Sequence, residues 1–426
     1  MIFKVFIFLI LCGVTTALTN ILADSPYFLD ERLQQSVVMK SLDSSENEFQ
    51  FEMADLLGLN ERPRSIKKPL SLKKSASKFL LELYNSITEE ENPHTYSHHN
   101  RVARSTFVNK EDRSVIENCN NIITFSSKKS RTNRKQNKSH MTVIFNTNNV
   151  PEDLQLVRAE LRIFQNSNLA RKFEYERNVT VSVFHRLFNR KLQKIDLRLL
   201  NSFTTTTSYN GWLEANVTKT IAKWLLKGFT PNGHELIIST RLTGMSNEVL
   251  ADNDENITPK DIGLVDESGN EENQPFIIGY FNGPELLNKI QHLRVKRDIG
   301  KKKIFSSDYS PAHHTEGESY KIPKNCERMN FSIDFKDLQM QDWVIAPKKF
   351  EAYFCGGDCN FPLGAKMNAT NHAIVQTLMH LKQPNLPKPC CVPTVLGSIS
   401  ILHYLNEDSV NLSKYPNSVA KSCGCL

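Results

Sequence analysis

The stretch "FCGGDC" at residues 354–359 and the terminal "KSCGCL" at residues 421–426 decide the fold. In the first, two glycines lie within a Cys-x3-Cys pair; in the second, one glycine separates two cysteines. Cysteines this close, flanked by the smallest residue, predict strands pressed together by disulfide bonds. That interpretation requires an oxidising compartment, because the same spacing in the cytosol would indicate metal binding or redox chemistry.

The amino terminus indicates export. Lys4 forms a short basic region, an apolar run extends from Val5 to Val14, and the small residues Thr15 and Ala17 fit the requirements of signal peptidase. We therefore expect a signal peptide at residues 1–17 and a secreted, extracellular protein; a buried core helix is the alternative for the apolar run. The run is too short to span a bilayer, and no other apolar run reaches about 18 residues.

Asn-x-Ser/Thr sites fit the same route, since they are glycosylated in the secretory pathway. The sequence has seven, at Asn137, Asn178, Asn216, Asn256, Asn330, Asn368 and Asn411. The pattern is short, so any one of them can occur by chance.

The cysteines show where the chain divides. Of nine, Cys12 leaves with the signal peptide, Cys119 is isolated, and the rest follow Asn325. Between the two regions lies "LRVKRDIG", in which Arg294, Lys296 and Arg297 form the pattern that subtilisin-like processing proteases accept. We expect cleavage after Arg297, although a basic run is often only a solvated loop.

The segment after this site, residues 298–324, is polar and poor in large apolar residues, which predicts a flexible basic arm. Lys301, Lys302 and Lys303 suit binding to heparan sulphate, and a merely solvated arm is the alternative. The adjacent His313 and His314 offer no ligand geometry. We expect no metal and no cofactor.

The region from 18 to 297 is expected to be an α+β propeptide. Apolar residues recur at helical spacing in "FEMADLLGLN" (51–60) and "ASKFLLELY" (76–84), which predicts two amphipathic helices. From about residue 140, short alternating runs predict a β-rich domain; they are "MTVIF", "LRIF", "VTVSVF", "LIIST" and "FIIGYF". Because no catalytic triad, metal-spaced histidine cluster or phosphate loop is evident, shielding of the C-terminal region is the natural role.

The last region has the spacing of a threaded knot. Linking Cys355 to Cys423 and Cys359 to Cys425 closes a ring of eight residues. A third bridge, Cys326–Cys391, threads such a ring only if nothing bulky points inward. Gly357 and Gly424 supply that clearance and the necessary backbone freedom.

The cysteine count of this region is odd, which leaves Cys390 without a partner in its own chain. An exposed free thiol is poorly tolerated outside the cell, so we expect a disulfide to a second chain. The segment "NATNHAIVQTLMHLKQ" predicts a helix capped by Thr370 or Asn371, with one apolar face formed by Ile374, Val375, Leu378 and Met379. Such an open domain encloses little core, so crosslinks of roughly 2–4 kcal/mol each and a partner over the helix must stabilise it.

The cysteine frame, with "CGGDC", "NATNHAIVQTLMH", "PKPCCVPT" and the final "CGC", resembles the bone morphogenetic protein branch of the TGF-β superfamily. The resemblance covers residues 325–426, and "LLGLNERPR", "SKFLLELYNSI" and "GWLEANVTKTIAKWL" are similar to propeptide segments of the same branch. It implies a small, dimeric cystine-knot growth-factor fold of two β-ribbons and one helix. It also implies a secreted ligand that assembles type I and type II receptor serine/threonine kinases, drives SMAD-type signalling in developmental patterning and is controlled by extracellular antagonists.

The resemblance further implies two receptor surfaces. The type I receptor surface corresponds to Met340, Trp343, Phe361, Pro362 and Leu363. The type II receptor surface corresponds to Ala346, Pro347, Ser400 and Leu402. Ordinary dimer packing is the alternative role for exposed apolar residues such as Phe361 and Leu363.

Several residues depart from the family pattern. Met340 stands where most of the branch has a second Trp, and Lys348 and Lys349 replace a more usual acidic or Gly-containing turn, which puts type I receptor affinity in doubt. Pro416 removes a backbone donor from the last ribbon, which predicts an edge strand or a bulge. Cys119 pairs between propeptides or, as we favour, is a buried thiol.

The sequence also offers alternatives for processing and for function. "RVAR" (101–104) and "RTNR" (131–134) also match a processing motif; we favour chance for both, with a second processing site at the first as the alternative. A secreted zymogen with residues 298–426 as its catalytic domain lacks any nucleophile or ligand arrangement, so we expect no enzyme. A cystine-knot antagonist or matrix protein remains an alternative function. The net charge of +7 lies mostly in the propeptide and does not indicate a nucleic-acid partner, and the second chain is either identical or a related bone morphogenetic protein.

Overall fold

The computed structural model describes residues 27–30, 35–38, 70–91, 110–128, 140–148, 150–170, 173, 175–189, 194–228, 230, 233–243, 257–283 and 323–426. The chain divides into two compact units, Met1–Leu56 and Leu57–Leu426. In the first, β1 (Tyr27–Asp30) and β2 (Gln35–Val38) form an antiparallel pair. Every other element belongs to the second unit.

Some of the predicted features fall outside the described residues. They are the signal peptide at 1–17, the helix at 51–60, the R-x-x-R motifs, the processing site at 294–297, and most of the arm at 298–324. We refer below to residues 70–283 as the N-terminal domain and to residues 323–426 as the C-terminal domain.

The N-terminal domain contains an antiparallel four-stranded sheet with the order β4-β9-β6-β7. Its strands are β4 (Met141–Phe145), β9 (His234–Leu242), β6 (Asn178–Asn189) and β7 (Lys194–Thr206). The alternation of apolar residues that predicted strands has the expected result, since Met141, Val143 and Phe145 are buried and the residues between them are half-buried.

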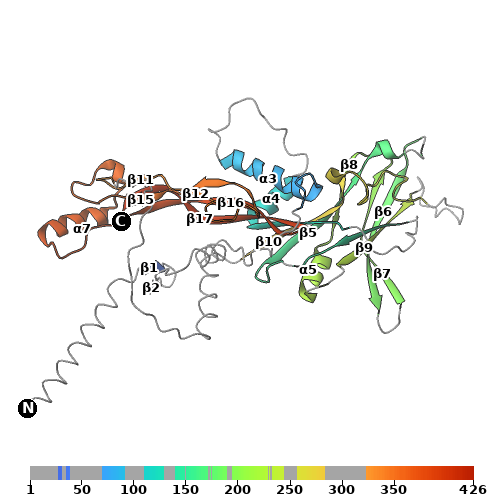
Figure 1. Cartoon of the computed structure of the whole chain (residues 1–426), viewed down its shortest axis with the longest axis horizontal. Helices are drawn as coiled ribbons and strands as arrows, with labels where there is room; N and C mark the ends of the chain where they lie inside the picture. Colours follow the sequence, from blue (N-terminus) through green and yellow to red (C-terminus); the bar gives the residue numbers. More distant parts are fainter. Residues whose placement is uncertain are drawn as a thin grey trace, which may run out of the picture. The chain divides into compact units, whose positions relative to one another are not determined.

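A second sheet joins the two domains. Its seven strands have the order β13-β16-β17-β3-β10-β5-β8, and all neighbours are antiparallel. The N-terminal domain supplies β3 (Asn121–Ser126), β5 (Gln155–Gln165), β8 (Gly211–Asn216) and β10 (Phe276–Asn282). The C-terminal domain supplies β13 (Val344–Ala346), β16 (Cys391–Asn406) and β17 (Ser409–Cys425). Figure 1 shows the ribbon of β16 and β17 running into the strands β10 and β5.

Residues 121 to 126 make this junction. In β3, Asn121 pairs with Ser413, Ile123 with Asn411 and Phe125 with Ser409 of β17. Because successive side chains of a strand point to opposite faces, Ile122 and Ile123 belong to different cores. The junction therefore buries both faces of the β3 strand.

One core lies between the two sheets of the N-terminal domain. It contains Val143, Val181, Leu161 and Ile277, together with Trp224 of α5 (Thr218–Lys227), which is 1% exposed. Two short 3-10 helices, η1 (Ser167–Leu169) and η2 (Glu271–Asn273), lie in loops of this domain.

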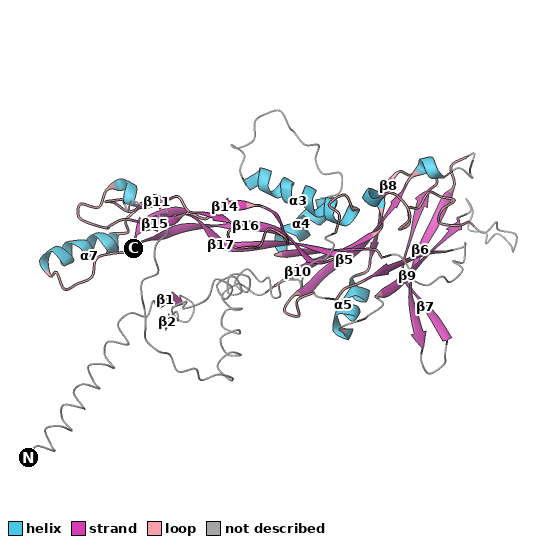
Figure 2. Cartoon of the chain, viewed as in Figure 1, coloured by secondary structure: helices cyan, strands magenta, loops and turns pink. Residues whose placement is uncertain are grey.

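The other core lies on the opposite face of the seven-stranded sheet, beneath α3 (Ser75–Glu91) and beside α4 (Lys110–Asn118). It combines apolar residues of both domains, namely Leu70, Ala76, Phe79, Leu80, Leu83, Cys119, Ile122, Phe276, Ile278, Tyr280, Leu402, Tyr404, Val410 and Leu412. Figure 2 shows α3 along one side of the strands. The predicted helix at 76–84 is therefore present, and its apolar face covers one part of the C-terminal domain, on β16 and β17.

The C-terminal domain has the expected two ribbons and one helix. The first ribbon consists of the pairs β11 (Glu327–Met329) with β15 (Phe354–Gly356) and β12 (Ser332–Asp334) with β14 (Lys349–Glu351). The second consists of β16 and β17. Between the ribbons come η3 (Ala365–Met367) and α7 (Asn371–Lys382).

Pro416 produces a bulge in the second ribbon. The register shifts between Gly397, which pairs with Val419, and Ile399, which pairs with Tyr415. Asn417 adopts a φ of 57° within the bulge. Pro416 lacks a backbone donor, so the bulge predicted from the sequence is the way in which this ribbon accommodates it.

Candidate receptor-binding surfaces and the cystine knot

Three disulfides cross-link the C-terminal domain, in the pairs expected from the sequence. They are Cys326–Cys391, Cys355–Cys423 and Cys359–Cys425, with Cα–Cα distances of 5.4, 5.7 and 5.9 Å. One sulfur from each of Cys326, Cys359 and Cys425 lies within 4.8 Å of the others. Within the described residues this is the one cluster with the spacing of metal ligands, and its sulfurs are committed to disulfides.

Two glycines beside the disulfides have no room for a side chain. At Gly357 the φ is +103°, and a Cβ would lie 2.2 Å from the carbonyl oxygen of Asn325. A Cβ at Gly424 would lie 2.6 Å from the carbonyl oxygen of Asn368. Backbone atoms cannot move aside as a flexible side chain can, so both positions exclude a side chain.

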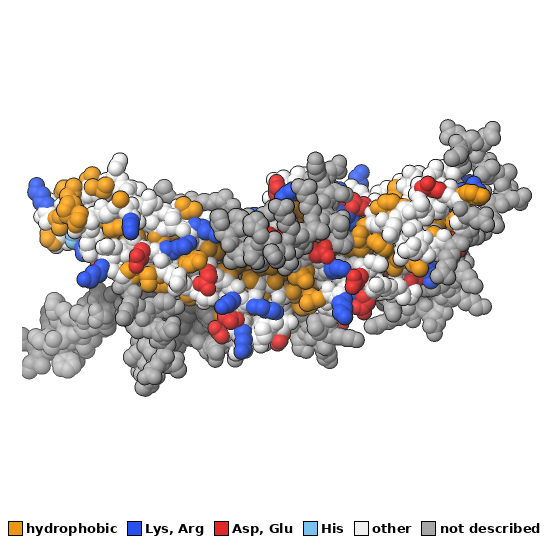
Figure 3. Space-filling view, turned by 90° about the horizontal axis from the view of Figure 1, so that it is seen from above, with side chains coloured by type: hydrophobic (Ala, Val, Ile, Leu, Met, Phe, Trp, Pro, Cys, Tyr) orange, Lys and Arg blue, Asp and Glu red, His pale blue; other side chains and the backbone are white. Residues whose placement is uncertain are grey.

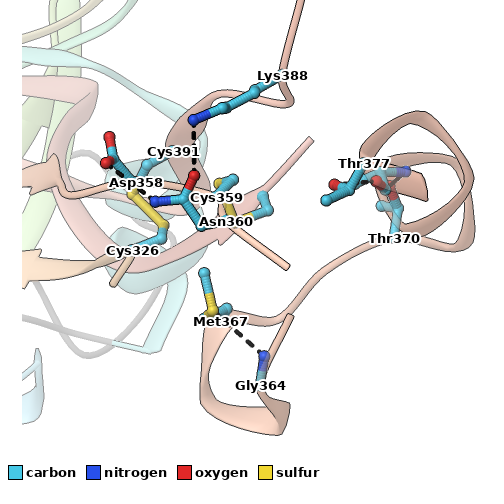
Figure 4. The surroundings of a disulfide bond; sticks show 12 residues. Cys326, Asp358, Cys359, Asn360, Gly364, Met367, Thr370, Thr377, Lys388 and Cys391 are labelled. Atoms are coloured by element: carbon cyan, nitrogen blue, oxygen red, sulfur yellow. Dashed lines mark hydrogen bonds between the residues drawn. A yellow bond between two sulfur atoms is a disulfide. The ribbon is translucent and has the colours of Figure 1, made fainter. Parts of the chain in front are cut away.

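Polar contacts fix the loop between the knot and α7. Asn360 donates to the Asp358 carboxylate at 3.1 Å and accepts from Lys388 at 2.8 Å, as Figure 4 shows. Thr370 is the N-cap of α7, since its hydroxyl oxygen accepts a hydrogen bond from the backbone N–H of Ala373 at 3.2 Å. Of the two capping residues that the sequence suggested, the structure selects Thr370.

The remaining described cysteines have opposite surroundings. Cys390 is exposed, at a point where its backbone exchanges hydrogen bonds of 3.0 and 3.1 Å with Leu426. Cys119 is buried in the core beneath α3, and burial raises the pKa of its thiol. The surroundings of Cys119 match the buried thiol that we favoured.

The apolar face of α7 is exposed in the described part of the chain. Side chains of its apolar residues are exposed by 38–60%, and these residues are Ile374, Val375, Leu378, Met379 and Leu381. Figure 3 shows orange side chains gathered at the end of the C-terminal domain where α7 lies. A contiguous apolar face of this kind marks an interaction surface.

The residues predicted to bind a type I receptor do not share one environment. Phe361 is 53% exposed, Pro362 is exposed and Leu363 is half-buried. Met340 and Trp343 are 2% and 6% exposed, because they pack within the chain. In this conformation only the loop residues before α7 offer contact surface, and Met340 and Trp343 do not.

All the residues predicted to bind a type II receptor are buried or half-buried, and two of them contact the core shared with the N-terminal domain. Leu402 is fully buried in the core under α3, and Ser400 is 4% exposed. Ala346 and Pro347 are half-buried, and Ala346 packs against the same core. Of the two lysines that depart from the family pattern, Lys348 donates to the carbonyl oxygen of Val344 at 3.0 Å, and Lys349 is exposed.

The predicted glycosylation sites also differ in environment. Asn178, Asn216, Asn330 and Asn368 are exposed, whereas Asn137 and Asn256 lie outside the described residues. Asn411 is 4% exposed, and its side-chain amide donates hydrogen bonds to neighbouring groups. Glycosylation of Asn411 therefore does not fit this structure.

Sequence reasoning missed the strand β3 and the polar groups beside it. His403 of β16 is 3% exposed, and burial lowers its pKa to about 4 against the smaller raising effect of its hydrogen bond to the Tyr404 carbonyl. Its ring lies 6.1 Å from that of Trp343, at a near-perpendicular angle of 88°. The signal for β3 was "NIITF" itself, a short apolar run rich in β-branched residues that begins two residues after Cys119.

Comparison with known proteins agrees with this architecture. The family model for the TGF-beta propeptide matches residues 31–280, and that for the transforming growth factor beta like domain matches residues 325–425. None of the helices in the described part of the chain is both long and apolar enough to cross a membrane.

Three relatives span most of the chain. Protein screw of Drosophila melanogaster is 50% identical over 380 residues, covering 88% of this chain and 90% of that protein. Protein 60A of the same species is 36% identical over 426 residues, covering 94% and 91%. Human Bone morphogenetic protein 8A is 30% identical over 391 residues, covering 89% of each. The chain belongs to the TGF-β family, in its bone morphogenetic protein branch, and is a growth-factor precursor with a propeptide rather than an enzyme.

Proposed function

We propose that the chain is exported through a signal peptide at residues 1–17, cleaved after Arg297, and active as a disulfide-linked dimer of residues 298–426. The propeptide is then residues 18–297, and the growth-factor domain is residues 325–426. The dimer brings together type I and type II receptor serine/threonine kinases and drives SMAD-type signalling, with developmental patterning as the setting. The basic arm at 298–324 binds heparan sulphate.

The observation that carries this proposal is the uncovered end of the C-terminal domain. Cys390 is exposed, and the apolar side chains of α7 are 38–60% exposed among the residues that the structure describes. A second growth-factor domain satisfies both features, because it supplies a thiol for Cys390 and an apolar surface for α7. The small core of the domain adds a thermodynamic reason for the partner.

The propeptide regulates access to receptors under this proposal. The core beneath α3 contains Leu402, Tyr404, Val410 and Leu412 of the growth-factor domain, so the expected type II receptor surface is occupied before release. Removal of the N-terminal domain exposes those side chains. The loop with Phe361, by contrast, is already accessible.

Expression in a secretory cell line tests the proposal. The chain is produced alone and together with a second bone morphogenetic protein, and the mature products are compared by mass with and without reductant. Receptor-kinase activation is measured on the same samples. We expect a covalent dimer that activates receptors, and the Cys390→Ser variant is expected to give only monomers in the non-reduced sample.

The outcomes distinguish the alternatives. A weak homodimer and a potent mixed species indicate that the heterodimer is the active ligand, whereas equal potency removes that idea. A covalent dimer that binds receptor ectodomains without activating any kinase identifies an antagonist. A Cys390 thiol that stays free in the intact secreted product overturns the dimer proposal.

A further inference from the structure

The side chain of Asn411 lies in a hydrogen-bond network that crosses the junction between the domains. Its amide nitrogen donates to Ser413 Oγ at 2.7 Å, to His403 Nε2 at 3.2 Å and to Asn121 Oδ1 at 3.3 Å. Ser413 in turn donates from its hydroxyl group to Asn121 Oδ1 at 2.7 Å. Asn121 belongs to β3 of the propeptide, and the other three residues belong to the growth-factor ribbon.

The donors and acceptors of this network are consistent with one another. His403 Nδ1 lies 3.3 Å from the carbonyl oxygen of Tyr404, so Nδ1 carries the proton and Nε2 accepts from Asn411. Two growth-factor side chains thus converge on one propeptide oxygen, Asn121 Oδ1. Because Ser413 is 4% exposed, loss of that oxygen leaves its buried hydroxyl donor without this partner, whereas the Asn411 amide keeps Ser413 Oγ and His403 Nε2 as acceptors.

The same residues form a glycosylation sequon, Asn411-Leu412-Ser413. Transfer of a glycan replaces one hydrogen of the Asn411 amide nitrogen with the anomeric carbon of the first sugar, and the lipid pyrophosphate carrier leaves. The glycosylated Asn411 amide then has one N–H, whereas its two N–H groups now donate to three acceptors, Asn121 Oδ1, His403 Nε2 and Ser413 Oγ. The sugar also requires space beside a side chain that is 4% exposed.

We propose that Asn411 is a propeptide-recognition residue, and that a glycan on Asn411 and the pairing of β17 with β3 are mutually exclusive. This inference rests on the secretory route proposed above, because only that route exposes the sequon to glycosylation. Asn411 follows residues 70–283 in the sequence, so it enters the lumen after the N-terminal domain. When β17 pairs with β3, the sequon is no longer accessible to the glycosylating enzyme. Molecules that are glycosylated first at Asn411 cannot form this pairing.

Site mapping tests the exclusion. The complex is isolated through a tag on the N-terminal domain and treated with peptide N-glycosidase in water labelled with oxygen-18, which marks each glycosylated Asn in the peptide map. We expect label at one or more of the exposed sites Asn178, Asn216, Asn330 and Asn368, and none at Asn411. Labelled Asn411 in the propeptide-bound growth factor overturns the proposal.

Two substitutions test recognition independently of glycans. Asn121→Leu removes the shared acceptor, and we expect the dissociation constant of the cleaved propeptide to rise about tenfold, since the buried Ser413 hydroxyl loses its acceptor and one stranded donor is worth about that factor. We also expect label to appear at Asn411 in the unbound growth factor. Asn411→Asp keeps the size of the side chain but removes both the donors and the sequon, and should weaken binding similarly.

The controls separate this proposal from the function proposed above. Ser182→Ala removes an exposed hydroxyl that pairs with Ser202 at 3.1 Å in the other sheet, and it should change neither measurement. Disulfide mapping of each variant confirms that the growth-factor domain has folded. If no Asn of the chain carries the oxygen-18 label, the proposed secretory route is contradicted. The propeptide affinities of the variants still decide whether Asn411 is a recognition residue. Unchanged affinity in both variants overturns the recognition role of Asn411.

Discussion

The hydroxyl group of Tyr404 donates a hydrogen bond to the backbone carbonyl oxygen of Leu70 across 3.2 Å. Tyr404 lies in the growth-factor ribbon, and Leu70 lies in the propeptide, just before α3 begins at Ser75. Both side chains are buried in the core that the two domains share, and burial raises the pKa of Tyr404. This contact holds the start of α3 on the surface that a type II receptor is expected to use.

Tyr404→Phe tests that contact with little change of shape. The variant retains the buried ring but leaves the Leu70 carbonyl without its donor, which costs about 1 kcal/mol. We expect the cleaved propeptide to bind about fivefold more weakly, measured by titration calorimetry. Tyr209→Phe is the matched control, because its hydroxyl donates to the Trp212 carbonyl at 3.0 Å within the propeptide. Equal affinities for both variants would refute a role for Tyr404.

Phe79→Ala tests whether α3 shields the ribbon. Phe79 is 1% exposed, and its ring centroid lies 5.8 Å from that of Phe276. Truncation of a buried phenyl ring costs about 3–5 kcal/mol, so α3 should detach and expose Leu402. We expect type II receptor ectodomain to bind the uncleaved variant precursor in surface plasmon resonance.

The control for Phe79→Ala is Leu226→Ala, which truncates a side chain that is 87% exposed on α5. This variant should bind receptor no better than the unmodified precursor. If the unmodified precursor already binds type II receptor at full strength, α3 does not act as a shield.

The sequence predicted the local features of the growth-factor domain well, because each depends on residues close together in the chain. Thr370 caps α7 through a hydrogen bond to the third residue after it. Pro416 causes a bulge because it lacks a donor. The cysteine spacing alone predicted that Gly357 and Gly424 stand where a side chain would not fit, because closely spaced disulfides leave little space between strands.

Features that depend on distant residues were missed. The run at 121–126 is apolar and rich in β-branched residues, but its partner strand begins at Ser409, and periodicity within a short window says nothing about pairing at that distance. The sequon at Asn411 spans three residues, so the motif cannot reveal that Asn121 lies beside it. The burial of Met340 and Trp343 likewise depends on tertiary packing, which the local sequence does not reveal.

Gly357→Ala tests the steric argument for the knot, with Gly356→Ala as its control. A Cβ at Gly357 meets backbone oxygen at 2.2 Å, and its φ of +103° is rarely adopted by other residues. A Cβ at Gly356 meets only side-chain atoms, the nearest at 3.4 Å, which is ordinary contact. We expect Gly357→Ala to abolish secretion of correctly bridged protein and Gly356→Ala to preserve it, as measured by disulfide mapping of the medium. Equal yields would show that the knot does not need this glycine.

Acid should weaken the precursor through His403. Burial lowers the pKa of this ring from 6.5 to about 4, so the unfolded chain takes up a proton at a higher pH than the folded one. Stability is therefore complete above pH 6.5 and is lost as the pH falls toward 4, by at most about 3 kcal/mol at 1.36 kcal/mol per pH unit. Protonation also turns Nε2 into a donor that faces the Asn411 amide, which breaks the network at the junction.

The measurement is the urea midpoint of the precursor at neutral pH and at several values down to about pH 4. His185 and His234 contribute to the same slope, because burial also lowers each pKa to about 4, and their rings lie 6.1 Å apart beside Trp224. His403→Gln should therefore lower the neutral midpoint while flattening part of the slope, and His185→Gln should flatten a separate part. A slope unaffected by His403→Gln would mean that this ring does not titrate on unfolding, and the acid sensitivity would then belong to the propeptide pair alone.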